Sequence, residues 1–161
     1  MTTVTNNFVL VISQEHKLIL ETLGELEAIL KTSEPADMIG QLKELIGKFK
    51  KKIIDHQYFE EEVIFKAALE AMPSEKVISI ILNLQKEHGI FLNSLETFAA
   101  QIMPLTKAAP NTDTIEKNLA QFSDLLKKHS LREVKELFPM ITNNSRCRQL
   151  IDLYANRLKN C

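Results

Sequence analysis

The sequence predicts an all-α protein: an up-down-up-down four-helix bundle with a short extra C-terminal helix. Only four glycines and five prolines interrupt the 161 residues, so long unbroken segments lie between them. In those segments, apolar residues recur at a spacing of three and four, which is the period of a helix buried on one face. The connections are mostly short, which favours antiparallel neighbours, and no segment has the pattern of a strand.

The first two helices are expected at about 8–30 and 33–71. Asn6 or Asn7 caps the first helix. The second begins at Ser33-Glu34-Pro35, because proline is favoured in the first turn of a helix. A tight break at Met72-Pro73-Ser74 follows it.

Two more long helices and a short one complete the prediction. Ser74 caps the third, which runs to about Ile102. Residues 103–113 form the longest loop, and Asp113 caps the fourth helix, which Pro139 ends or kinks. The fifth helix, at about 144–158, is expected to pack outside the bundle.

Composition and charge favour one cytoplasmic domain over residues 1–161. The chain is long enough for a real core, and an apolar content of 45% excludes a disordered chain. A net charge of −1 gives no electrostatic reason to bind nucleic acid or a membrane. Cys147 and Cys161 form no CxxC motif, which fits a reducing compartment. The N-terminus has neither the basic segment of a secretion signal nor the apolar run of a membrane span.

An internal repeat relates the two halves of the chain. QEHKLILETL (14–23) aligns with KEHGIFLNSL (86–95), at an offset of 72 residues. FKKKIIDHQYFEEEVIF (49–65) aligns with FSDLLKKHSLREVKELF (122–138), at an offset of 73. The repeat predicts two helical hairpins related by a pseudo-two-fold axis.

The chain has four histidines, and each lies on the apolar stripe of a different long helix. The repeat maps His16 onto His88 and His56 onto His129. A glutamate follows each member of the second pair four residues later, so that both groups share one helix face. These glutamates are Glu60 and Glu133.

The expected heights of these histidines mostly agree. At 1.5 Å per residue, His56 lies roughly 22 Å before the break at Met72-Pro73, and His88 lies roughly 21 Å after it. His88 and His129 are also level. The expected heights of His16 and His56 differ by about one helical turn or slightly more.

Four imidazoles and two carboxylates at mid-bundle form a ligand set for first-row metal ions. Carboxylates suit hard ions, and imidazoles suit iron, zinc, copper or nickel. If both glutamates bridge two metals, each metal has two histidines and two carboxylate oxygens. An oxo or hydroxo bridge then leaves one open position per metal. A single such histidine is usually an ordinary core residue, but four without a metal would form a polar core with no evident partners.

This pattern resembles the hemerythrin-like (HHE cation-binding) domain. His16, His56-x3-Glu60, His88 and His129-x3-Glu133 carry the resemblance, which covers about residues 8–140. It implies a non-haem centre of two iron ions, with an oxo or hydroxo bridge. Such a centre binds or reacts with oxygen, nitric oxide or related small molecules such as peroxide.

Two departures separate the chain from the oxygen carriers of that family. Leu92 stands where their third helix has a second histidine, and Glu133 follows His129 by four residues where they have HxxxxD. The paired HxxxE pattern is closer to members implicated in repair of iron centres damaged by nitric oxide or oxidants. It also resembles some iron- or oxygen-sensing domains. A replacement ligand could come from Glu61, Glu87 or Tyr58, and the sequence selects none of them.

Residues beside the histidines have less specific interpretations. Glu15 and Glu87 could each orient an imidazole on a metal. Adjacent helix residues point about 100° apart, so ordinary surface charge is the preferred interpretation. Leu20 and Leu92 are expected to line a dry pocket that admits diatomic gases.

Three functions therefore stay open. A binding or sensing module would take up oxygen or nitric oxide. An enzyme or repair factor, acting in oxygen or nitrosative stress, would react with them or release iron to a damaged centre. A metal-free helical interaction protein is the third alternative, and no protein partner is indicated.

Overall fold

All the regular secondary structure in the residues that the structure, a computed structural model, describes is helical. These are residues 7–32, 34–105 and 112–161, and no strand occurs among them. The predicted all-α class is therefore confirmed. Asn6, Ser33 and residues 106–111 of the predicted loop lie outside the described residues.

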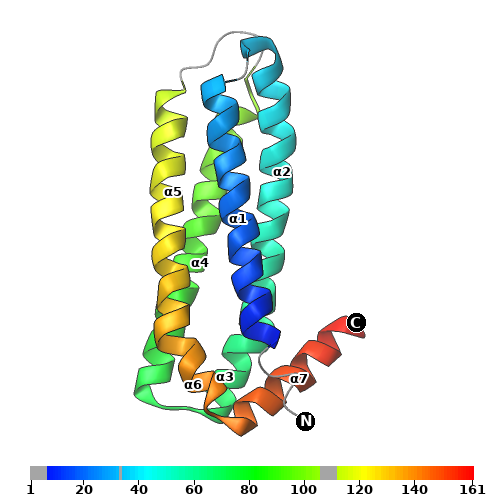
Figure 1. The fold of residues 1–161 in the computed structure, drawn as a ribbon, viewed down its shortest axis with the longest axis vertical. Coiled ribbons are helices and arrows are strands. Elements are labelled where there is room, and N and C mark those ends of the chain that lie inside the picture. Colours follow the sequence, from blue (N-terminus) through cyan, green and yellow to red (C-terminus); the bar gives the residue numbers. More distant parts are fainter. Residues whose placement is uncertain (1–6, 33, 106–111) are drawn as a thin grey trace.

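The long helices lie side by side as a bundle (Figure 1). Helix α1 spans Asn7–Thr32, and α2 spans Pro35–Phe59. Helix α4 spans Glu75–Ile102, and α5 spans Asp113–Arg132. Both α1 and α4 contact α2 on one side and α5 on the other, so the helices enclose a common interior.

Two of the long helical segments of the bundle, which we call rods, contain a π-helical turn that the sequence pattern did not predict. The turn η1, Glu60–Phe65, joins α2 to α3, which spans Lys66–Ala71. The turn η2, Glu133–Leu137, joins α5 to α6, which spans Phe138–Thr142. Such insertions occur within α-helices, often at functional sites. Both turns begin at the glutamate of an HxxxE pair.

The helix ends confirm one predicted cap and correct another. Ser74 caps α4 as predicted, because its Oγ accepts a hydrogen bond from the Val77 N–H at 3.3 Å. Asp113 is the first residue of α5, and Thr112 occupies the cap position. Pro139 lies in the first turn of α6, where a proline is tolerated, and α6 itself ends at Thr142.

Helix α7, Ser145–Lys159, lies across one end of the bundle (Figure 1). It contacts α3, α6 and η1. The Asn144 side chain caps α7 by accepting from the Cys147 N–H at 2.8 Å. Cys147, Leu150 and Ile151 are buried in the core, so this helix closes the bundle, although we expected it to pack outside.

The interior contains two apolar clusters. The lower cluster includes residues of α7, and the upper cluster lies toward the opposite end of the bundle. On α1, Ile12 belongs to the lower cluster and Ile19 to the upper one, with His16 between them in sequence. The other rods follow the same order, with His56, His88 and His129 between the two clusters. A polar layer therefore separates the two halves of the core.

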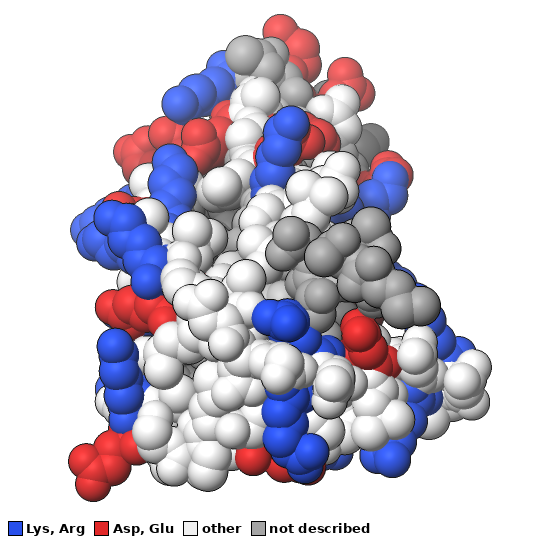
Figure 2. All heavy atoms as spheres, turned by 60° about the horizontal axis from the view of Figure 1, so that its bottom comes forward, with Lys and Arg blue, Asp and Glu red and all other residues white. Residues whose placement is uncertain are grey.

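The face at the α7 end carries charges of both signs. Figure 2 shows Lys and Arg interspersed with Asp and Glu around uncharged surface. Within the described residues, every helix is too short or too polar to cross a membrane.

Candidate metal centre

The structure brings all six side chains of the predicted ligand set together in the polar layer. Their exposed fractions lie between 0% and 5%. The four histidines come from α1, α2, α4 and α5, and the glutamates are the first residues of η1 and η2. The Nε2 atoms of His16 and His56 lie 3.0 Å apart, so the difference in height expected from the sequence does not separate them.

Glu60 lies between two pairs of histidines. Its Oε1 atom is 2.9 Å from His56 Nε2 and 3.6 Å from His16 Nε2. Its Oε2 atom is 2.9 Å from His88 Nε2 and 4.0 Å from His129 Nε2. Each carboxylate oxygen therefore faces a different pair of imidazoles.

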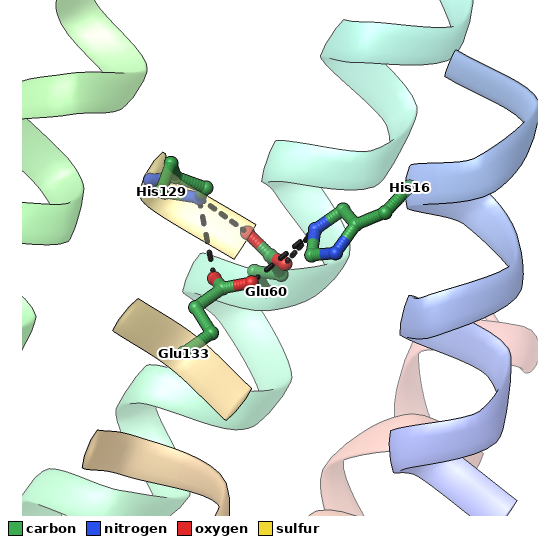
Figure 3. A group of neighbouring side chains, drawn as sticks. All are labelled: His16, Glu60, His129 and Glu133. Atoms are coloured by element: carbon green, nitrogen blue, oxygen red, sulfur yellow. Dashed lines mark ion pairs between the residues drawn. The ribbon is translucent and has the colours of Figure 1, made fainter. Parts of the chain in front are cut away.

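Glu133 divides its oxygens in the same way. Its Oε2 atom is 3.2 Å from His16 Nε2, and its Oε1 atom is 3.3 Å from His129 Nε2. Figure 3 shows these side chains and Glu60 pointing toward one another from three separate rods. One ligand atom from each of His16, Glu60, His129 and Glu133 fits within 4.8 Å of all the others.

Three carboxylates outside this layer contact the outer ring nitrogens of three of the histidines. His56 Nδ1 lies 2.6 Å from Glu15 Oε2, and His88 Nδ1 lies 2.7 Å from Glu61 Oε1. His129 Nδ1 lies 2.7 Å from Glu87 Oε2. A carboxylate can only accept, so each Nδ1–H donates. Nε2 is thereby left facing the polar layer, and in the neutral form of the ring it carries the lone pair that a metal would bind.

These contacts overturn one interpretation of the sequence. Glu15 and Glu87 are not ordinary surface charges, because each orients the histidine of a neighbouring helix. The repeat relates the two contacts, and that relation was the signal in the sequence. Glu87 also pairs with Arg132.

The three residues that could replace the missing third-helix histidine as a ligand lie outside the cluster. Glu61 and Glu87 contact the outer nitrogens of His88 and His129, so they approach the imidazoles from outside the layer. Tyr58 is 55% exposed on the surface. None of these three candidates therefore joins the six side chains of the cluster.

The buried charges set the protonation of the metal-free cluster. Burial lowers the pKa of His56, but Glu60 and the hydrogen bond to Glu15 raise it to about 10. Burial likewise lowers the pKa of His129, and hydrogen bonds to Glu133 and Glu87 raise it to about 9.

The two inner carboxylates differ in the direction of their shifts. Burial raises the pKa of Glu60, but His56, His16 and His88 together hold it well below its usual range. Burial and the charge of Glu60 raise the pKa of Glu133. Protons on His56 and His129 thus balance the buried negative charge, and a bound cation would replace those protons.

The donor set fits a metal. Among the described residues, six of its buried atoms have no partner in hydrogen-bonding geometry, although they lie close together as ion pairs. They are both oxygens of Glu60 and of Glu133, and the Nε2 atoms of His88 and His129. Buried polar atoms without partners require an explanation, and a bound ion is one. Imidazole nitrogens with carboxylate oxygens are a common ligand combination for iron.

The surface near the cluster differs from the dry pocket expected from the sequence. Leu20 lines an open groove of about 510 Å³ that also contacts His16, Ser130 and Val134. Polar side chains line this groove too. Leu92 is 37% exposed and does not line it.

Buried histidines and shared carboxylates inside a helical bundle are the features of a non-haem metal-binding helical protein. Comparison with protein families agrees, since the hemerythrin HHE cation-binding domain matches residues 7–141. The match covers more than half of the chain, which therefore belongs to this family. Searches of curated proteins and of solved structures found no match.

Proposed function

We propose that the protein holds two iron ions and binds or reacts with oxygen, nitric oxide or peroxide. The observation that carries the proposal is that the two carboxylate oxygens of Glu60 face different histidines, and so do those of Glu133. One set contains His16, His56, Glu60 Oε1 and Glu133 Oε2. The second contains His88, His129, Glu60 Oε2 and Glu133 Oε1. Each set offers two imidazoles and two carboxylate oxygens, which is the arrangement of a bridged pair of metals.

The scaffold that we propose is one up-down-up-down four-helix domain over residues 1–161. The contacts of α1 and α4 with both α2 and α5 support this arrangement. Helix α7 lies beyond the family match, and its buried residues belong to the same core cluster as Phe8 and Ile12. The free thiols of Cys147 and Cys161 support a reducing, cytoplasmic compartment.

The chain's own residues would position and insulate the centre. A bound iron pair would supply redox chemistry and sites for a small exogenous ligand. Glu15, Glu61 and Glu87 fix three imidazoles so that Nε2 faces inward. The apolar clusters on both sides of the layer exclude water from above and below.

The similarity of the two sets favours reaction or repair over reversible oxygen transport. In the oxygen carriers of the family that the sequence resembles, the two irons have unequal numbers of histidines. Here each set has two, so both metal positions keep room for an exogenous ligand. This supports a role in oxygen or nitrosative stress, or in repair of iron centres. The alternative is a binding module that senses or stores oxygen or iron without catalysis.

Metal content and an optical spectrum test the proposal directly. We expect two iron ions per chain and near-ultraviolet absorption typical of a coupled ferric pair. Zinc at the same stoichiometry would give no such spectrum and would exclude the redox role. A metal-free protein after aerobic and anaerobic purification would favour the helical interaction protein.

Anaerobic mixing of the reduced protein with oxygen, and separately with nitric oxide, distinguishes the two functional alternatives. A stable and reversible oxygen adduct would favour the binding module. Rapid turnover of the gas, or loss of iron from the protein, would favour reaction or repair.

A further inference from the structure

The internal repeat makes His16 and His88 equivalent, but the residues near the outer nitrogens of these two histidines differ. His88 corresponds to His16 at an offset of 72, and Glu61 corresponds to Val134 at an offset of 73. Glu61 accepts a hydrogen bond from His88 Nδ1 at 2.7 Å. Valine has no polar side-chain atom, and within the described residues His16 Nδ1 makes no hydrogen bond. In the part of the chain that the structure describes, His16 is therefore the one histidine held only through its inner nitrogen.

A second pair of equivalent residues changes the space around these histidines. Gln57 is buried, and its amide Nε2 donates to the His88 carbonyl oxygen at 3.4 Å. The repeat places Ser130 at the corresponding position on α5. Ser130 is much smaller, and its buried Oγ has no hydrogen-bond partner among the described residues. Gln57 and Glu61 thus occupy the α2/α4 side, and shorter side chains leave the α1/α5 side more open.

The groove of about 510 Å³ lies on the open side. His16, Ser130 and Val134 line it, and Val134 is 47% exposed. The groove is open to solvent, so a hydrated divalent cation can reach the residues that line it. Ser13 and Glu21 supply oxygen atoms along the same groove.

Given the di-iron centre of the proposed function, we infer that His16 is its displaceable ligand. The α1/α5 groove is the route by which a metal ion enters and leaves the set that contains His16 and His56. An imidazole without an outer acceptor can turn away from the metal without breaking a second hydrogen bond. The set that contains His88 and His129 lies behind Gln57 and Glu61, so its metal exchanges more slowly.

Release of iron to a chelator measures this difference. The wild-type protein is loaded anaerobically with Fe(II), its iron content is determined, and it is mixed with excess ferrozine. We expect two phases of equal amplitude, one ion per chain in each. Val134→Glu supplies the acceptor that His16 lacks, so it should slow the fast phase roughly 10- to 100-fold, the usual effect of an outer hydrogen-bond partner.

Two other variants make the test specific. Leu131→Glu adds the same charge at a neighbouring position that is 52% exposed, and it should leave both phases unchanged. Glu61→Val removes the acceptor of His88 and should accelerate the slow phase. Circular dichroism checks that each variant is folded.

The outcomes separate this inference from the function on which it rests. A chain that binds two irons and releases them in a single phase would overturn the inference and leave the di-iron proposal standing. Slowing by Leu131→Glu as large as that by Val134→Glu would do the same. Fewer than two irons per loaded chain would refute the di-iron proposal itself.

Discussion

Three consecutive glutamates provide a graded test of the metal centre. Glu60 is buried between both pairs of histidines, and Glu61 contacts His88 from outside. Glu62 is exposed. Replacing each in turn by glutamine keeps the size of the side chain and removes one negative charge. The three variants therefore have the same composition and differ only in where the charge is lost.

The structure gives the expected order of effects on metal affinity. A single pair of unit charges 4 Å apart is worth about 4 kcal/mol at an effective dielectric constant of 20. At about 1.4 kcal/mol per factor of ten, Glu60→Gln should weaken binding at least about a thousandfold. Glu61→Gln should weaken it about 10- to 100-fold, because it acts through the orientation of His88. Glu62→Gln should have no measurable effect.

The assay is iron content after gel filtration, followed by competition with a chelator of known affinity. Urea unfolding of each metal-free variant shows whether the fold persists. Equal affinities for the Glu60 and Glu62 variants would refute the assignment of Glu60 as a shared ligand. A larger loss for Glu61→Gln than for Glu60→Gln would show that our inner and outer positions are reversed.

Three further predictions follow from burial and charge. A thiol reagent should label Cys161, which is exposed, but not Cys147, whose pKa burial raises to about 11; labelling of two thiols in the native protein would contradict this. The folded pKa values of His56 and His129, about 10 and about 9, exceed the ordinary value of 6.5, so their contribution to stability is complete below pH 6.5. The melting temperature of the metal-free protein should therefore fall as pH rises from about 6.5 to 10, and a rise would show that the sign is wrong. Phe122→Ala should lower the free energy of urea unfolding by about 3–5 kcal/mol, because this ring is 1% exposed in the upper cluster. Its metal stoichiometry should stay unchanged, since the ring contributes no ligand.

Some features of the fold were hidden from sequence periodicity. The π-helical turns at Glu60 and Glu133 add a residue within a turn without breaking the rod, so the apolar pattern continues across them. Pro139 follows the boundary between η2 and α6 and lies in the first turn of α6, where its missing N–H is tolerated. The sequence pattern cannot show where a π-helical turn occurs, because that depends on which carbonyl oxygen accepts a hydrogen bond from each backbone N–H.

The sequence by itself determined where the helices lie and that His16, His56, His88 and His129 face their apolar interior. Both follow from the local period of 3.6 residues, which is a property of each segment alone. Only the tertiary structure decided which carboxylate serves which nitrogen. Glu15 is adjacent to His16 in sequence, yet it binds His56, because neighbouring residues on a helix point about 100° apart and the rotation of α1 against α2 selects the partner. That rotation is set by packing between distant segments, so no local pattern records it.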